Sequence, residues 1–213
     1  RQDGAEWPSG AWERIGRDVT LDNLLQEVLK DEVFFRASGG GVTLSGGEVL
    51  MQAGFAARFL QRLRQWGIRT AIETAGDGAF DRVLPVAEAC NEVLFDFKIM
   101  EPERARSLLR MNQPRVLDNF RRLAARKINL IPRVPLIPGY TLNTDNFRQI
   151  LAFLAPFALK EMHLLPFHQY GEPKYRLLGK PWTLASVKAP DEAEIQPYRV
   201  MAEAAGLHVT IGG

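Results

Sequence analysis

Residues 68–98 read IRTAIETAGDGAFDRVLPVAEACNEVLFDFK, which is the pattern of an apolar strand, an amphipathic helix and a second apolar strand. The spacing predicts strands at 68–73 and 92–97, joined by a helix at 79–89. Strands connected through a helix in this way lie parallel in one sheet, because a parallel pair needs a crossover connection. This unit therefore predicts an α/β fold built on a parallel sheet.

The same alternation of strands and helices continues on both sides of this unit. Further strands are predicted at 42–44, 129–134, 161–165 and 207–211, and further helices at 21–29, 51–66, 102–110, 115–126, 144–154 and 191–205. Polar residues close or follow successive strands, namely Glu48, Glu73, Asp96, Arg133 and His168. Polar groups at every strand end converge on one mouth in a (β/α) barrel, whereas an open doubly wound sheet gathers them at one switch point. The sequence therefore favours a TIM-like barrel or a partial one.

The composition and charge of the chain exclude several classes of function. The chain has 213 residues, 46% of them hydrophobic, and a formal charge of +2, so nothing favours nucleic acid or an anionic membrane surface as a partner. Its single cysteine, Cys90, excludes an intramolecular disulfide and any zinc or iron–sulfur site that needs several thiolates from this chain. Cys90 itself is predicted to be a plain core residue near the end of a helix. Residues 1–19 are interpreted as a linker or remnant, and residues 20–213 as one domain.

The densest motif is the stretch SGGGVTLSGGE at residues 38–48. Paired glycines let backbone groups approach a ligand closely, and the carboxylate of Glu48 can accept an ammonium. A loose turn with a solvated Glu is the alternative. The string LSGGE at 44–48 also resembles the signature loop of ABC-type ATPases, but no G-x-x-x-x-G-K-[ST] phosphate loop is present.

Charged residues at the other strand ends are candidates for the same site. Glu73 with Thr74, and Asp96 with Lys98, end two apolar strands, where a carboxylate is costly to desolvate unless it is paired or bound to a cation. An ion pair between Asp96 and Lys98 on a solvated rim is the alternative.

Two further candidates follow later strands. Arg133 lies in a proline-rich stretch that is predicted to leave the sheet early, because proline is rare inside a central strand. His168 follows a buried strand, where its ring can stack on a ligand or form a hydrogen bond with it. His163 and His208 are predicted to be packed or to face solvent.

In chain order, these segments resemble the radical S-adenosylmethionine enzymes that activate glycyl radical enzymes. The resemblance rests on FFRASGGGVTLSGGE at 34–48, ETAG at 73–76, DFK at 96–98, RVPLIPG at 133–139 and LPFH at 165–168, and it covers nearly everything from Val19 onward. It implies a partial (β/α) barrel that lacks its first βα unit and an oxidoreductase that is cytoplasmic and works anaerobically. It also implies S-adenosylmethionine as cofactor, a glycyl radical enzyme as protein substrate, and flavodoxin or ferredoxin as electron donor.

The resemblance carries over to individual positions. Contacts to S-adenosylmethionine are implied for Gly46, Gly47, Glu48, Lys98, Arg133, Leu165 and His168. The Gly-Gly-Glu motif would hold the methionyl ammonium, and Leu165 would form an apolar wall near the adenine. Glu73, Thr74 and Asp96 are the implied ligands of a monovalent cation. Glu73 stands where the best-known members have Asp, and Val49 where many relatives have Pro.

One feature of the family is missing. Its [4Fe–4S] cluster is held by a C-x-x-x-C-x-x-C loop near the N-terminus, and no such loop occurs in this sequence. We therefore expect the chain to be the C-terminal part of such an enzyme and to be inactive alone. The alternative is a cluster-free module that binds S-adenosylmethionine or docks to a partner.

Overall fold

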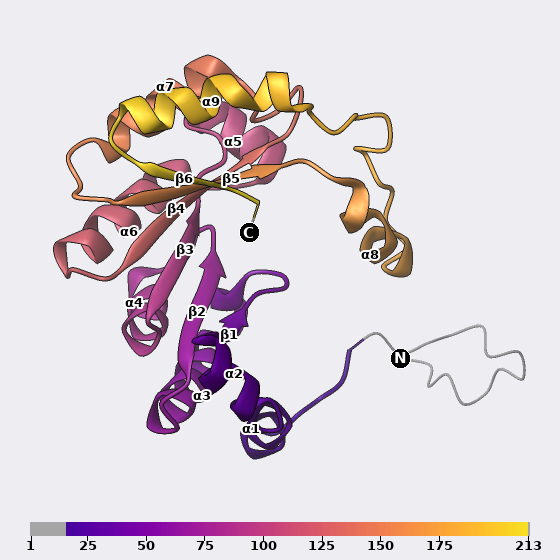
Figure 1. Cartoon of the computed structure of the whole chain (residues 1–213). Coiled ribbons are helices and arrows are strands. Elements are labelled where there is room, and N and C mark those ends of the chain that lie inside the picture. The colour runs from indigo at the N-terminus through magenta and orange to yellow at the C-terminus, as the bar shows by residue number, and fades with distance from the viewer. Residues whose placement is uncertain (1–15, 213) are drawn as a thin grey trace, which may run out of the picture.

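The computed structural model describes residues 16–212 and shows a six-stranded parallel sheet whose spatial order equals the chain order. The strands are β1 (Gly41–Leu44), β2 (Arg69–Thr74), β3 (Glu92–Asp96), β4 (Leu130–Leu136), β5 (Glu161–Pro166) and β6 (His208–Ile211). A doubly wound sheet would reverse its strand order at a switch point, and this order never reverses. The predicted α/β fold of the partial-barrel type is confirmed (Figure 1).

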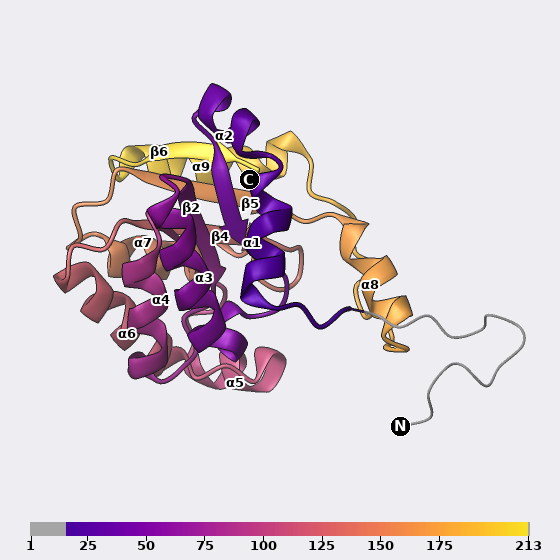
Figure 2. The same ribbon diagram turned by 90° about the horizontal axis from the view of Figure 1, so that it is seen from below.

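Helices cover the outer face of the sheet, and the opposite, concave face carries no such layer of helices in the described part of the chain (Figures 1 and 2). The longer helices are α1 (Leu21–Leu29), α3 (Ala53–Gln65), α4 (Phe80–Ala89), α5 (Pro102–Leu109), α6 (Gln113–Ala125), α7 (Thr144–Leu154) and α9 (Glu192–Ala204). The shorter ones are α2 (Glu32–Ser38), η2 (Val49–Gln52), η3 (Gln169–Gly171) and α8 (Glu172–Leu177). Within residues 16–212, none of the helices is long and apolar enough to cross a bilayer.

Strand residues alternate between the two faces of the sheet. On the outer face, Ile72, Phe95 and Val134 are fully buried against the helices, in a core that also contains aromatic contacts such as Phe95 with Phe120. The neighbouring residues in sequence turn to the concave face. This alternation places charged side chains of adjacent strands next to one another there.

The prediction that the proline-rich stretch leaves the sheet early is wrong. β4 continues to Leu136 and includes Pro132 and Pro135. The Arg133 carbonyl accepts from the Phe97 backbone N–H, so odd-numbered residues of β4 face β3 and even-numbered ones face β5. The nitrogen of Pro132 therefore faces β5, but the pairing of β4 with β5 begins only at the next residue, Arg133. The nitrogen of Pro135 faces β3, but the pairing of β4 with β3 has already ended at Arg133. Each proline therefore lies at a limit of the pairing that its nitrogen faces, and neither interrupts a ladder of hydrogen bonds.

Most other elements lie within a few residues of their predicted positions. Thr20 caps α1, as predicted, by accepting a hydrogen bond from the Asn23 backbone N–H at 3.2 Å. The two short helices α2 and α8 were not predicted as separate helices, and neither has a fully buried residue. Of the predicted linker at 1–19, residues 1–15 lie outside the described residues.

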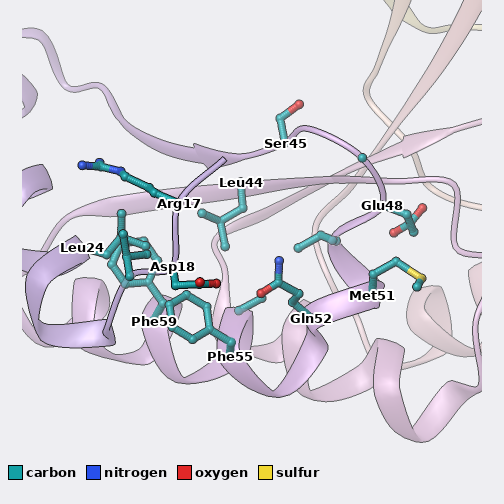
Figure 3. A pocket seen from close by; sticks show the side chains of 14 residues that line it. Arg17, Asp18, Leu24, Leu44, Ser45, Glu48, Met51, Gln52, Phe55 and Phe59 are labelled. Carbon is teal, nitrogen blue, oxygen red and sulfur yellow. The ribbon is translucent and has the colours of Figure 1, made fainter. Parts of the chain in front are cut away.

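β1 forms one edge of the described sheet. It pairs with β2 alone, and Gly41 and Thr43 are exposed. Beside it lies a cavity of about 600 Å³ between α1, β1 and α3. Figure 3 shows apolar side chains along this cavity and Glu48 at its far end. A free parallel edge next to a cavity that is lined in part by apolar side chains such as Leu24 and Phe59 is a template for association.

We expect the chain to self-associate through β1, or to have this edge covered by residues 1–16. Sedimentation over a wide concentration range should show a dimer or larger species that Thr43→Lys weakens, because a charge on an edge strand opposes strand addition. Gln149→Lys on α7 is the matched control, since it adds the same charge at another exposed site.

Hydrogen exchange separates the two expected outcomes. A monomer with slowly exchanging β1 amides would mean that residues 1–16 cover the edge. A monomer at high concentration whose β1 amides exchange fast would contradict the prediction.

Candidate functional site

The strand ends of β2, β3 and β4 meet in an ionic network on the concave face. Arg133 of β4 donates from Nη1 to Glu73 Oε1 at 2.7 Å and from Nε to Asp96 Oδ1 at 3.0 Å. Lys98 Nζ lies 3.7 Å from Asp96 Oδ2, and Ser45 donates to Glu73 Oε2 at 2.5 Å. Only 9% of the Arg133 side chain is exposed. The structure thus brings four of the predicted site residues together.

The pKa values of Glu73 and Asp96 are shifted in opposite directions, because burial is outweighed by hydrogen bonds at Glu73 but not at Asp96. Burial opposes ionisation of Glu73, but the hydrogen bonds from Ser45 and Arg133 outweigh it and hold the pKa of Glu73 below its ordinary value. Burial dominates at Asp96 and raises its pKa above the ordinary value, although Lys98 and Arg133 act against it. Asp96 is therefore the carboxyl that depends most on its cationic neighbours.

Glu48 is fixed by three hydrogen-bond donors. Its side chain caps η2 by accepting from the Leu50 backbone N–H at 3.2 Å, and it also accepts from Thr74 Oγ1 at 2.6 Å and from the Ala75 backbone N–H at 3.0 Å. A carboxylate has about four acceptor positions. One position therefore remains for a further donor such as an ammonium.

Thr74 does not join Glu73 and Asp96. Its hydroxyl donates to Glu48 and accepts from the Gly76 backbone N–H at 2.9 Å, and only 3% of the residue is exposed. Successive strand residues point to opposite faces, so Thr74 faces away from the concave side where Glu73 lies. The structure brings the two carboxylates to one guanidinium instead of gathering the three predicted cation ligands.

Gly46 and Gly47 form an open backbone loop between β1 and Glu48. Gly46 has φ +122°, which L side chains rarely adopt, and a Cβ at either position would have no neighbour within 4 Å. The Gly46 carbonyl accepts a hydrogen bond from Lys174 Nζ at 3.2 Å. The Gly46 carbonyl is therefore accessible to an ammonium group.

Leu165 and His168 lie at and beyond the end of β5. Leu165 is half-buried and is the register partner of Pro135, between the buried outer-face residue Leu164 and the strand end. His168 Nδ1 accepts from the Tyr170 backbone N–H at 3.2 Å, so the proton of the neutral ring is on Nε2. The His168 and Tyr170 rings are 4.4 Å apart.

Cys90 is a core residue, as predicted. It is the C-cap of α4, and its thiol donates to the Ala87 carbonyl at 3.3 Å. Burial raises the pKa of this thiol to about 11, so it is neither a thiolate ligand nor a nucleophile at neutral pH. The described residues contain no group of three or more His, Cys, Asp and Glu that could hold a metal ion.

Sequence reasoning missed three residues that belong to this region. The contact of Ser45 with Glu73 could not be predicted, because any of several side chains could follow β1. The contact of Lys174 with the glycine loop could not be predicted either, because the two are 128 residues apart in the sequence. His163 was interpreted as packed or facing solvent, and its buried Nδ1 agrees with packing, but its position beside Arg133, with that nitrogen unpartnered among the described residues, was not predicted. Burial, with Arg133 acting in the same direction, lowers the pKa of His163.

We predict that Arg133→Met lowers the free energy of unfolding by about 3 kcal/mol at pH 7, because Glu73 and Asp96 would lose their shared countercharge. The loss should shrink as the pH falls. In the wild-type chain the depressed pKa of Glu73 contributes stability that is lost in acid, whereas in the variant protonation relieves the repulsion between the carboxylates. Urea denaturation at pH 7 and pH 3 measures both effects.

Arg199→Met provides the control, since Arg199 pairs with Glu203 on the exposed surface of α9, where solvent screens the pair and its loss should hardly change the free energy of unfolding. An Arg133 variant as stable as this control at pH 7 would show that the network does not hold the strand ends together.

No protein-family model matches the chain. Among known proteins, it is 61% identical over 212 residues to the pyruvate formate-lyase 2-activating enzyme of Escherichia coli K12, covering all of this chain and 73% of that enzyme. It is 35% identical to the choline trimethylamine-lyase activating enzyme of Oleidesulfovibrio alaskensis, over 89% of this chain and 62% of that enzyme's length. The chain thus spans less than two thirds of the second relative and about three quarters of the first.

Solved structures agree with these relatives. A domain of a pyruvate-formate lyase-activating enzyme from Bacteroides vulgatus superposes with a TM-score of 0.67 and 29% identity, over 82% of this chain and 99% of that domain. A radical S-adenosylmethionine methyltransferase from Sphaerobacter thermophilus has a TM-score of 0.69 over 92% of this chain and 58% of that chain, and at 15% identity it shows the fold alone. By its identity with the Escherichia coli enzyme along its whole length, the chain belongs to the glycyl radical enzyme activating enzymes, which are radical S-adenosylmethionine enzymes.

Proposed function

We propose that this chain binds S-adenosylmethionine at its strand ends and forms the barrel part of an enzyme that activates a glycyl radical enzyme. The observation that carries the proposal is the ammonium-accepting site, in which the Gly46 carbonyl accepts from Lys174 Nζ and the nearby Glu48 carboxylate keeps one acceptor position. The 61% identity with a pyruvate formate-lyase 2-activating enzyme favours a protein substrate of the type named for that relative.

The proposed cofactor contacts divide by chemistry. Gly46, Gly47 and Glu48 bind the methionyl ammonium, while Lys98 supplies a positive charge toward the rest of the cofactor. Arg133 lies between Glu73 and Asp96 and is mainly a positioning residue for these carboxylates. Leu165 supplies an apolar surface and His168 a hydrogen-bond donor.

A monovalent cation at Glu73 and Asp96 stays a prediction. The proposed ligand set does not include the Thr74 hydroxyl, because that group is bonded to Glu48. Any cation bound there would share the two carboxylates with the Arg133 guanidinium.

The residues of this chain do not fit an iron–sulfur cluster, since its one cysteine is buried with a pKa of about 11. When present in an enzyme of this family, the cluster supplies the electron for cleavage of S-adenosylmethionine. We propose that a flavodoxin or ferredoxin provides that electron and that the enzyme works in the cytoplasm.

We predict that the 213-residue chain assembles no iron–sulfur cluster and releases no deoxyadenosine, because one thiolate cannot replace three. Anaerobic reconstitution with iron and sulfide, followed by iron and deoxyadenosine analysis, measures this directly. A stoichiometric cluster together with deoxyadenosine would contradict it. The alternative, a cluster-free binding module, would be favoured if this chain bound S-adenosylmethionine and longer natural forms of the protein also assembled no cluster.

In an enzyme that joins this chain to a three-cysteine cluster segment, Glu48→Gln and Asp96→Asn should lower activation of the protein substrate at least tenfold. Glu48→Gln removes the charge that attracts the ammonium, and Asp96→Asn removes a partner of both Lys98 and Arg133. Glycyl radical yield by electron paramagnetic resonance, with binding of S-adenosylmethionine measured in parallel, is the readout.

Cys90→Ala is the control, and it should keep near wild-type activity because Cys90 lies in the core away from the strand ends. Equal activity in all three variants would contradict the prediction and would mean that Glu48 and Asp96 are solvent-exposed charges at the rim without a role in cofactor binding.

A further inference from the structure

The segment that contains η3 and α8 stands apart from the sheet and its helices (Figure 1). All residues of α8 are exposed. At its base, Trp182 Nε1 donates to Gln169 Oε1 at 2.6 Å, and Gln169 Nε2 donates to the carbonyls of Leu184 and Val187 at 3.0 and 2.8 Å. These contacts fix the base of the segment and leave α8 itself with little packing.

α8 also touches the opposite side of the mouth. Lys174 lies in α8, after β5, and its Nζ reaches the carbonyl of Gly46, which follows β1. The contact therefore joins the two sides of the concave face, between strands that are not neighbours in the sheet. Because the lysine is exposed and α8 has no buried residue, this contact can open without disrupting the core.

We propose that Lys174 occupies the ammonium position of the cofactor site and must leave Gly46 before the methionyl ammonium can bind there. The inference rests on the proposed function, which assigns that carbonyl and Glu48 to the ammonium of S-adenosylmethionine. It makes Lys174 a residue that sets affinity for ligands with an amino group at this position.

Competition follows from charge. Two ammonium groups on one carbonyl would lie within a few ångströms of each other and repel. The retained acceptor position of Glu48 does not relieve this repulsion, because a single carboxylate neutralises one of the two charges. Binding of the cofactor ammonium therefore displaces Lys174 and frees α8 from the β1 side, while the base around Trp182 keeps its contacts.

The test compares ligands that differ only in the amino group. Titration calorimetry of the 213-residue chain uses S-adenosylhomocysteine, which carries the same amino-acid group, and its deaminated analogue. Lys174→Met should bind S-adenosylhomocysteine about threefold more tightly than wild type, the size expected for loss of an exposed ionic competitor. Its affinity for the deaminated analogue should not change.

Lys180→Met is the matched control. It removes the same charge from the same exposed segment, and its side chain makes no ion pair or hydrogen bond among the described residues, so it should change neither affinity. Hydrogen exchange gives a second readout. S-adenosylhomocysteine should speed exchange of the α8 amides in the wild-type chain, and Lys174→Met should do so without ligand.

The outcomes separate the two proposals. Wild-type binding that Glu48→Gln abolishes, with an unchanged or weakened Lys174→Met variant, would overturn the role of Lys174 and leave the proposed function standing. Equal tightening for both ligands, or in both lysine variants, would also overturn it, because the effect would then be general electrostatics. Absence of binding in the wild-type chain and in both lysine variants would overturn the proposed function and this inference together.

Discussion

The concave face depends on one buried guanidinium. Arg133 reaches from β4 to Asp96 on β3 and to Glu73 on β2, so a single side chain ties together three strand ends. Parallel strands bring their carboxyl ends to one edge, which here concentrates two carboxylates in a partly desolvated place. Without Arg133 these charges would repel, and Asp96, whose pKa burial already raises, would be the first to take up a proton. The arginine therefore allows a charged mouth to coexist with an apolar core directly behind it.

The end of β2 then links this network to the glycine loop. Glu73 faces Arg133 on the concave side, while its neighbour Thr74 faces outward and holds Glu48. Two adjacent residues of one strand thus fix the positions of two carboxylates that serve different purposes. Glu48 keeps an acceptor position two residues along the chain from a carbonyl that accepts from Lys174, whereas the charge of Glu73 is paired with the Arg133 guanidinium. The carboxyl end of β2 can therefore hold a cation on one of its sides and stay electrically balanced on the other.

Much of this arrangement could be predicted from the sequence, because apolar periodicity and strand-end charges are local signals. The order of strands, most element positions and the gathering of Glu73, Asp96, Lys98 and Arg133 followed from them. The course of β4 could not be predicted, since the harm done by Pro132 and Pro135 depends on which neighbour each nitrogen faces, and that is a property of register. The side-chain direction of Thr74 and the contact from Lys174 to Gly46 were hidden for the same reason: both depend on tertiary geometry that no local pattern encodes.

The central claim, that the strand ends of this chain bind S-adenosylmethionine, is tested most directly by mapping where the molecule binds. Backbone amide shifts of the isotope-labelled 213-residue chain can be followed by nuclear magnetic resonance while S-adenosylmethionine is added. The account predicts perturbations at residues 45–48, 74–76, 96–98 and around His168. Perturbations confined to the cavity of about 610 Å³ beside Lys127, Leu130 and Lys160, at the other end of β4 and β5, would contradict it, as would no perturbation at saturating concentrations.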